Sequence, residues 1–252
     1  MHTIISAHAI RQSGPPGGRP MLFSHGFGTD QRSWQHVAPH FADRHRVVTF
    51  DLAGCGQATR YFNPKRYATL EGYARDLVDI LDRLDLHDVV YIGHSVSCMI
   101  GILAAARRGE RFGKMVLLGP SPHYLNDGAY AGGFSREDID GMLDTLEGNQ
   151  LGWSSDPEDP AGERNDFCRM PPDVAAAFAR TAFLSDHRLR LPEHRLPTLI
   201  LQASDDNVAG TAIGRFVSEQ ITGSKIIYLT ARGHSPHLTE PAEVIAAIDS
   251  FL

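Results

Sequence analysis

The sequence predicts a single α/β domain in which helices cover both faces of a mostly parallel sheet. Two observations lead to this fold class. Short apolar runs rich in Val, Ile and Leu, typical of strands buried on both faces, alternate along the chain with segments of helical periodicity. The alternation stops between residues 120 and 196 and then resumes, which indicates a helical insertion within the sheet domain.

The composition is that of an ordinary globular protein, with 42% apolar and 21% charged residues in a chain of 252. A formal net charge of −6 argues against binding to nucleic acid. The chain has no run of about 18 apolar residues and no signal-peptide pattern, so we expect no membrane association. Its three cysteines, an odd number without C-x-x-C spacing, favour reduced thiols in the cytoplasm.

Local patterns predict the first elements of the chain. Residues 3–10 form a weak strand candidate, and a Gly- and Pro-rich surface loop follows. The apolar runs at 21–24 and 47–50 are typical of buried strands. Residues 69–84 carry apolar side chains at helical spacing, which predicts an amphipathic helix lying on the sheet.

The segment 89–101 predicts a strand that turns sharply into a helix. Residues 89–92 are apolar, residues 97–106 are small and apolar, and Gly-His-Ser-Val-Ser joins the two runs. This is the context of a nucleophile elbow, in which small neighbours such as Gly93 and Ser97 let Ser95 occupy a strained turn at a helix N-terminus. Taken alone, the pentapeptide also fits an ordinary turn, so its interpretation depends on partner residues elsewhere.

The inserted segment follows a predicted strand at 115–118. Residues 120–196 carry no convincing strand, but Ser135 begins one predicted helix and residues 173–184 form a second. A helical insertion near the mouth of a site is a lid. We expect the polar, turn-forming stretch 155–166 to be an exposed loop.

The strand pattern resumes at 198–202 and 225–229, with a helix between them over 210–221 and a last helix after them. Ser95, then Asp205 or Asp206, then His234 each follow a predicted strand, in the Ser, Asp, His order of hydrolases built on such a sheet. His234 would act as the general base for Ser95, and a carboxylate would orient the imidazole. The pattern does not separate the two aspartates.

An early loop offers donors for the negative charge that such a reaction develops. The strand at 21–24 runs into His-Gly-Phe-Gly, and loops of this type give one backbone N–H to an oxyanion hole. The residue after the nucleophile gives the other, so we predict donors at Phe27 and Val96. Without an elbow downstream, the same loop would be an ordinary strand-ending turn.

His234 and His237 also form an H-x-x-H pair, for which a metal site is the alternative interpretation. Zinc protease ligands lie on a helix with the sequence H-E-x-x-H, whereas this pair lies in a loop containing Gly and Pro. We therefore expect no metal and no cofactor.

Several motifs together resemble one family. They are G-H-S-V-S-C-M-I-G, H-G-F-G-T-D-Q, R-Y-A-T-L-E-G-Y from Arg66, G-P-S-P-H-Y-L-N-D from Gly119, F-L-S-D-H-R from Phe183 and G-H-S-P-H from Gly233. On these motifs, which span nearly the whole chain, the sequence resembles the RsbQ-type α/β-hydrolases. That family includes a bacterial stress-response regulator and the plant karrikin and strigolactone receptors.

The resemblance implies an α/β-hydrolase core, residues 1–119 and 197–252, and a lid of four helices over an apolar pocket, residues 120–196. It also selects Asp206 as the triad aspartate. The stretch after Gly152-Trp is polar where the family has an apolar helix, so we hypothesise a shortened lid and a wider pocket. Aromatic lid residues pack in a core by default. The resemblance nevertheless implies substrate contacts for Phe27, His94, Val96, Tyr124, Trp153, Phe183 and Val208.

Two functions follow from the resemblance. The first is a serine carboxylesterase or lactonase that hydrolyses a small hydrophobic ester or butenolide-like lactone through an acyl-enzyme intermediate. The alternative is a sensing module that binds or slowly hydrolyses its ligand and regulates a signalling partner. Perhydrolysis and C–C bond hydrolysis also use a Ser triad and stay open, whereas dehalogenases and epoxide hydrolases have Asp in place of Ser95.

Overall fold

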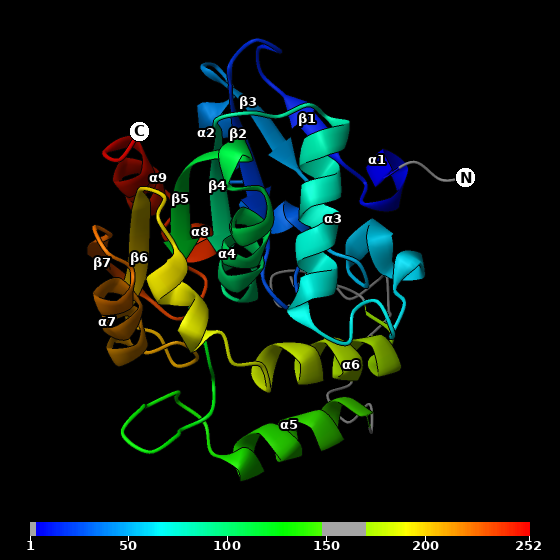
Figure 1. The fold of residues 1–252 in the computed structure, drawn as a ribbon, viewed down its shortest axis with the longest axis vertical. Coiled ribbons are helices and arrows are strands. Elements are labelled where there is room, and N and C mark those ends of the chain that lie inside the picture. The colour runs from blue at the N-terminus through cyan, green and yellow to red at the C-terminus, as the bar shows by residue number, and fades with distance from the viewer. Residues whose placement is uncertain (1–3, 148–169) are drawn as a thin grey trace.

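A computed structural model describes residues 4–147 and 170–252 and confirms the predicted fold class (Figure 1). One sheet of seven strands has the order β1-β3-β2-β4-β5-β6-β7. The edge strand β1 is antiparallel to β3, and all other neighbours are parallel. The strands are β1 Arg11–Ser13, β2 Arg19–Ser24, β3 His45–Thr49, β4 Val89–His94, β5 Phe112–Leu118, β6 Thr198–Asp205 and β7 Lys225–Arg232.

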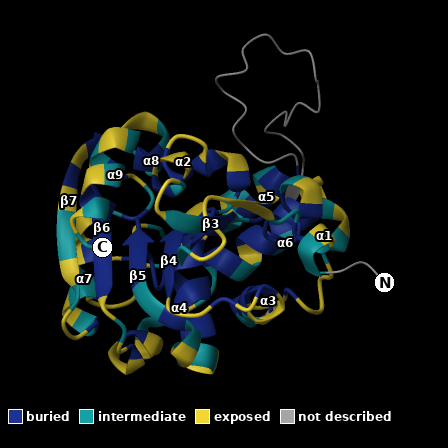
Figure 2. Ribbon diagram, turned by 90° about the horizontal axis from the view of Figure 1, so that it is seen from above, coloured by how far each residue is buried: buried dark blue, intermediate teal, exposed yellow. Residues whose placement is uncertain are grey.

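Helices cover both faces of the sheet, with α3, α4 and α7 on one side and α2, α8 and α9 on the other (Figure 2). Two longer helices of the insertion, α5 and α6, pack side by side beyond the sheet (Figure 1). The α-helices are α1 Ile4–Ala7, α2 Ala38–Phe41, α3 Leu70–Arg83, α4 Val96–Arg108, α5 Arg136–Glu147, α6 Pro172–Phe183, α7 Thr211–Gln220, α8 Pro236–Thr239 and α9 Pro241–Asp249. Short 3₁₀ helices occur at η1 Gln31–Trp34, η2 Gly56–Tyr61, η3 Gly109–Arg111 and η4 Arg188–Glu193.

The apolar strand runs divide their side chains between two cores. In β4, Val89 and Tyr91 belong to the core beneath α3 and α4, whereas Val90 and Ile92 belong to the core on the opposite face. Successive residues of a strand point to opposite faces, so a strand buried on both sides needs a continuous apolar run. This requirement explains why the strand pattern in the sequence was unbroken rather than alternating.

The predicted strand over residues 3–10 is wrong. The described part of this segment forms the short helix α1, and the strand at this edge of the sheet is instead the polar, exposed β1. Ile4 and Ile5 pack against the α3 side of the core, and the ring of His8 donates to the carbonyl of Asp51 over 2.8 Å. Tertiary contacts therefore override the β propensity of the two isoleucines.

The insertion between β5 and β6 contains α5 and α6, as predicted from Ser135 and from residues 173–184. Residues 148–169 lie outside the described residues, and with them lie Trp153 and the stretch 155–166. The shortened lid therefore stays a hypothesis. Over 4–147 and 170–252, no helix is long and apolar enough to cross a membrane.

The pH dependence of stability is expected to include a contribution from His194, which follows η4 and is buried. Its Nε2 donates to the hydroxyl of Thr198 over 3.0 Å, and burial lowers the pKa of His194 from 6.5 to about 4. The unfolded chain therefore binds a proton at higher pH than the folded one. The resulting stabilisation is present above pH 6.5 and is lost as the pH falls to 4, a loss of roughly 3 kcal/mol.

Urea unfolding at pH 7.5, 6, 5 and 4.5 would measure this contribution. The variant His194→Gln keeps an N–H donor but cannot titrate, so between pH 6 and 4.5 its unfolding free energy should fall less steeply than that of the wild type. The slopes of unfolding free energy against pH should differ by up to about 1.4 kcal/mol per pH unit, which corresponds to the uptake of one proton on unfolding. Identical slopes would contradict the assignment.

Candidate active site

The turn between β4 and α4 holds Ser95 in a strained conformation. Ser95 has φ +57° and ψ −123°, a left-handed conformation that side chains rarely adopt and that costs about 1–3 kcal/mol. Gly93 allows the close approach that follows, because a Cβ there would lie 2.8 Å from the carbonyl oxygen of Ser97. The strand, turn and helix predicted from the sequence are therefore present, and they place the Ser95 hydroxyl at the carboxyl edge of the sheet.

Ser95, His234 and Asp206 form one hydrogen-bonded chain. The Ser95 hydroxyl lies 2.8 Å from Nε2 of His234, and Nδ1 of His234 lies 2.8 and 3.0 Å from the two carboxylate oxygens of Asp206. An ionised carboxylate only accepts, so Nδ1 carries the ring proton and Nε2 is left to accept from Ser95. This arrangement can remove the proton from the serine and hold the imidazolium that forms.

The two neighbouring aspartates have different positions. Asp205 ends β6 with an exposed side chain, and its carbonyl accepts from the backbone N–H of Gly233 over 2.8 Å. Asp206 turns inward to His234 and is 9% exposed. One Asp206 oxygen also accepts from the backbone N–H groups of Val208 and Ala209, at 2.8 and 2.9 Å. The structure thus pairs Asp206, and not Asp205, with the imidazole.

The two predicted oxyanion donors belong to chain segments next to Ser95. Phe27 lies in the loop after β2, and Val96 is the first residue of α4, where N–H groups have no partner within the helix. Neither N–H has a hydrogen-bond partner in the part of the chain that the structure describes. The loop approaches closely, since a Cβ at Gly26 would lie 3.3 Å from Cβ of Ser95. Both N–H groups are thus available to a negatively charged oxygen near Ser95.

The ring of His25 holds the loop after β2. Its Nδ1 donates to the carbonyl of Gly26 over 2.8 Å, and its Nε2 accepts from the N–H of Leu52 over 2.9 Å. His25 is fully buried, and this burial lowers its pKa. The ring therefore stays neutral, in the tautomer that these two bonds require.

His94, which the resemblance places at the substrate, is 2% exposed. Its Nε2 donates to the backbone carbonyl of His234 over 2.8 Å, and its ring lies against the rings of His234 and His237, at centroid distances of 4.9 and 4.4 Å. Burial lowers the pKa of His94 well below 6.5. Within the described ranges, no group of three or more His, Cys, Asp or Glu residues could hold a metal ion.

Aromatic rings from three parts of the chain pack against one another, and one of them contacts Ser95. The hydroxyl of Tyr124, which follows β5, lies 3.3 Å from the Ser95 hydroxyl, and the ring of Phe183 on α6 lies 4.6 Å from that of Tyr124. Phe27 contacts Phe183 and Phe178 edge-on, at 5.9 and 5.4 Å. Ser95 itself is 6% exposed. Aromatic side chains therefore pack close to the hydroxyl, and the Tyr124 phenol is a polar group near it in addition to the His234 imidazole.

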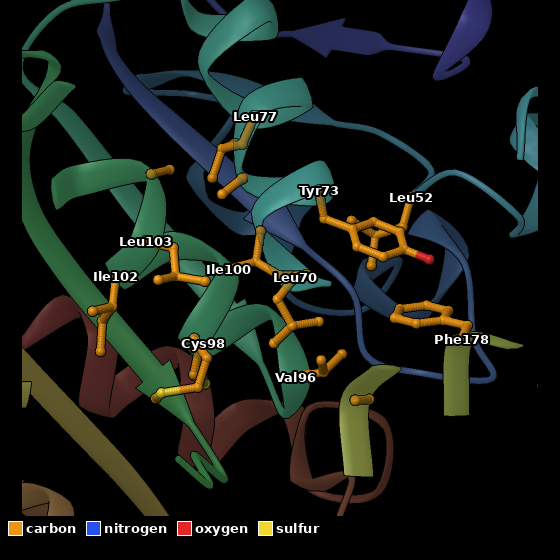
Figure 3. Packing of buried hydrophobic residues seen from close by; sticks show 14 of the residues in the cluster. Leu52, Leu70, Tyr73, Leu77, Val96, Cys98, Ile100, Ile102, Leu103 and Phe178 are labelled. Carbon is orange, nitrogen blue, oxygen red and sulfur yellow. The ribbon is translucent and has the colours of Figure 1, made fainter. Parts of the chain in front are cut away.

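The aromatic rings also join the insertion to the core. Tyr73 of α3 stacks on Phe178 of α6, with 4.6 Å between the ring centroids. Figure 3 shows this pair, and in the same view the side chain of Val96 lies inside the core beneath α4.

Val208 is half-buried after β6, and Trp153 lies outside the described residues. A groove of about 750 Å³ lies elsewhere, between residues 64–70 and α6, and its lining does not include Ser95.

Three contributions to the site were absent from the sequence prediction. Phe178 belongs to the helical pattern of residues 173–184, but nothing in that pattern says which loop its ring covers. The hydroxyls of Ser24 and Ser97 meet at 2.8 Å beside the elbow. Ser97 drew notice in the sequence only as a small residue, and a polar side chain at a position where smallness suffices is the signal that could have pointed to it.

Known proteins resemble the chain over nearly its whole length. The model of the Alpha/beta hydrolase family matches residues 21–247. A protein of Oryza sativa subsp. japonica named as a probable esterase is 38% identical over 263 residues, which cover 98% of this chain and 96% of the rice protein. A strigolactone esterase of Arabidopsis thaliana is 37% identical, with 96% of this chain and 95% of the other covered.

A receptor and a solved hydrolase structure are also similar to this chain. The Karrikin insensitive 2 receptor CA of Petunia hybrida is 36% identical, with 98% of this chain and 96% of the petunia protein covered. A solved hydrolase from Oleispira antarctica superposes with a TM-score of 0.91 at 34% identity, covering 98% of this chain and 95% of the other. With the parallel sheet and the Ser95 elbow, these matches show that the chain belongs to the alpha/beta hydrolase family.

Proposed function

We propose that the protein is a serine hydrolase that cleaves small esters or lactones with Ser95 as nucleophile, His234 as general base and Asp206 as the carboxylate that orients it. The observation that carries the proposal is the continuous hydrogen-bonded chain from the Ser95 hydroxyl through the imidazole to the Asp206 carboxylate, with 2.8 Å at each junction. The structural similarity to a solved hydrolase supports the fold, and the geometry of the site supports the chemistry.

The proposed acylation step needs the groups in these positions. The Ser95 oxygen attacks the carbonyl carbon of the ester while its proton passes to Nε2 of His234, and Asp206 stabilises the imidazolium. The carbonyl oxygen becomes negatively charged, and the N–H groups of Phe27 and Val96 are placed to donate to it. When the tetrahedral intermediate collapses, the alkoxide leaves with the proton from His234.

Deacylation then repeats the step with water. His234 takes a proton from the water molecule as its oxygen attacks the acyl carbon, and it returns the proton to Ser95 as the acid is released. In a lactone the alkoxide and the acyl group belong to one molecule, so a hydroxy acid is released. The scheme uses no metal and no cofactor.

The surroundings of Ser95 favour a small, hydrophobic substrate. The nucleophile is 6% exposed, and its hydroxyl contacts Tyr124, whose ring packs against Phe183, so a bulky or charged acyl group would have to displace packed aromatic rings. Two relatives carry the word esterase in their names, one of them strigolactone esterase. We assign substrate contacts to Tyr124, Phe183 and Val208. For Trp153, a substrate contact is proposed from the resemblance alone. We propose that His94 supports the loop of His234 and does not contact the substrate.

The second candidate is a ligand sensor. One specific observation favours it, which is that a protein 36% identical over 98% of this chain is named a karrikin insensitive 2 receptor. In this alternative the same site binds or slowly cleaves a small lactone and thereby changes contacts with a signalling protein partner. We assign both candidates to the cytoplasm, in line with the three cysteines of the sequence, which include no C-x-x-C pair.

Time courses with short-chain p-nitrophenyl esters and a fluorogenic butenolide would test the proposal. For an enzyme, we expect many turnovers per molecule and, after acid quenching, the mass of one acyl group on the peptide that contains Ser95. For a sensor, we expect about one product per molecule and a ligand-induced shift in melting temperature. If none of these compounds gave either product or adduct, the proposed chemistry would be refuted.

A further inference from the structure

We propose that Ser97 is a positioning residue that holds the two halves of the oxyanion hole in register, an inference that rests on the function proposed above. The Ser97 hydroxyl accepts a hydrogen bond from the hydroxyl of Ser24 over 2.8 Å and donates one to the backbone carbonyl of His25 over 2.5 Å. All three residues are fully buried. A buried hydroxyl that uses both its donor and its acceptor function is fixed in orientation.

These bonds connect the two chain segments that carry the proposed donors. The His25 carbonyl lies two residues before Phe27, and Ser97 directly follows Val96. The Ser97 side chain therefore joins the loop after β2 to the first turn of α4. A shift of either segment would separate the two N–H groups from a common oxygen atom.

The hydrogen bond from Ser97 to His25 lies just beyond the point where pairing between β2 and β4 ends. Strands β2 and β4 pair from Met21 to Ser24, and their last paired residues are Ser24 and Gly93. Beyond that pair, the loop leaves the sheet and cannot use its ladder of hydrogen bonds. His25 is the first residue after the paired part of β2, and its carbonyl accepts a hydrogen bond from Ser97 in place of one from a neighbouring strand.

Each segment is also held from its other side. The Tyr91 hydroxyl donates to the carbonyl of Ser97 over 2.8 Å, which ties the first turn of α4 to β4. The ring of His25 holds the loop to Leu52. The Ser97 hydroxyl connects these two anchored parts, so its removal should loosen their relative position more than the position of either part.

A requirement for a small side chain would explain Ser97 differently. Glycine or alanine would meet that requirement equally well, without a hydroxyl. The variants Ser97→Ala and Ser97→Gly therefore separate the two explanations, because both are small and both lack the hydrogen bonds. Ser24→Ala removes the bond to Ser97 but keeps the bond from Ser97 to His25, so it should have the smaller effect.

The test is steady-state hydrolysis of a p-nitrophenyl ester by these variants, together with inhibition by a trifluoromethyl ketone. Loss of one oxyanion donor lowers kcat by about 10²–10³-fold, and misplacement should do less. We expect kcat to fall about 10- to 100-fold in Ser97→Ala and Ser97→Gly, with KM within about threefold of wild type. Ser24→Ala should lose about threefold or less.

The ketone distinguishes positioning from general loosening. It adds to the serine and carries a negatively charged oxygen, so its inhibition constant should rise in parallel with the loss of kcat. The matched methyl ketone, which stays neutral, should bind unchanged. Ser250→Ala removes another hydroxyl-to-carbonyl bond, to Ala247 in α9 at 2.7 Å, and should keep wild-type activity.

Crystal structures of the wild type and of Ser97→Ala give a readout that needs no turnover. We expect the His25 carbonyl to move away from α4 and the Phe27 and Val96 nitrogens to separate. Wild-type kcat in Ser97→Gly, or an unmoved loop in the crystal, would overturn the inference. A wild-type protein that neither hydrolyses the esters nor binds the ketone would instead refute the proposed function, and the crystal comparison would still decide the role of Ser97.

Discussion

Replacing Ser95 with alanine is expected to lower kcat/KM for small esters by about 10⁴-fold or more, because Ser95 supplies the oxygen that forms the acyl-enzyme. The fold should persist, since alanine retains the Cβ that the turn already accommodates at φ +57°. The Tyr124 and His234 contacts of the hydroxyl are lost, a change that affects the site and not the two cores. Initial rates with p-nitrophenyl acetate and thermal unfolding would measure both effects.

Two controls make this result decisive. His234→Ala removes the base and should lower kcat/KM to a similar level, and the double variant should be no worse than either single variant, because residues of a triad act as a unit. Residual activity in the Ser95→Ala preparation should resist fluorophosphonates. Activity that survives Ser95→Ala undiminished would mean that the chemistry proposed here is wrong.

Replacing Asp206 with asparagine is expected to lower kcat by about 10⁴-fold. An amide cannot stabilise the imidazolium, and its NH₂ group facing His234 favours the tautomer with the proton on Nε2, which cannot accept from Ser95. The asparagine oxygen can still accept from the N–H groups of Val208 and Ala209, so the loop should keep its shape. Steady-state kinetics and the melting temperature would be measured together.

Asp205→Asn is the matched control for this variant. It removes the same charge from the neighbouring residue, but the Asp205 side chain is exposed and does not contact His234. We expect its kcat to stay within about twofold of wild type, since exposed charges contribute little. Equal losses in the two variants would show a general effect of charge, and a larger loss in Asp205→Asn would assign the carboxylate to the wrong residue.

The strands and helices near the site were largely predictable, because their patterns record burial. Continuous apolar runs such as 89–92 are required by a sheet covered on both faces, and residues 69–84 repeat at the period of a helix lying on it. The segment at 3–10 was not predictable, since two isoleucines suit a strand locally and only their contacts with the core select α1.

The site residues divide in the same way. Ser95 and His234 were identifiable because each follows a predicted strand, and parallel strands bring their carboxyl ends to one edge. The choice between Asp205 and Asp206 was not contained in that pattern, since both follow the same predicted strand. It depended on the resemblance, and the structure brings Asp206 within 2.8 Å of the imidazole.

The sequence was enough to predict the fold class, the order of the main strands and helices after residue 20 and the chain positions of Ser95 and His234. The contacts between distant side chains were not predictable in this way: Tyr124 with Ser95, Phe178 with Tyr73, and the Ser97 hydroxyl with the carbonyl of His25. The two kinds of feature differ in the distance along the chain over which they act. Burial and backbone preference produce periodic patterns among residues that are close in the chain. A hydrogen bond between residues 72 positions apart forms only once the sheet has placed β2 beside β4.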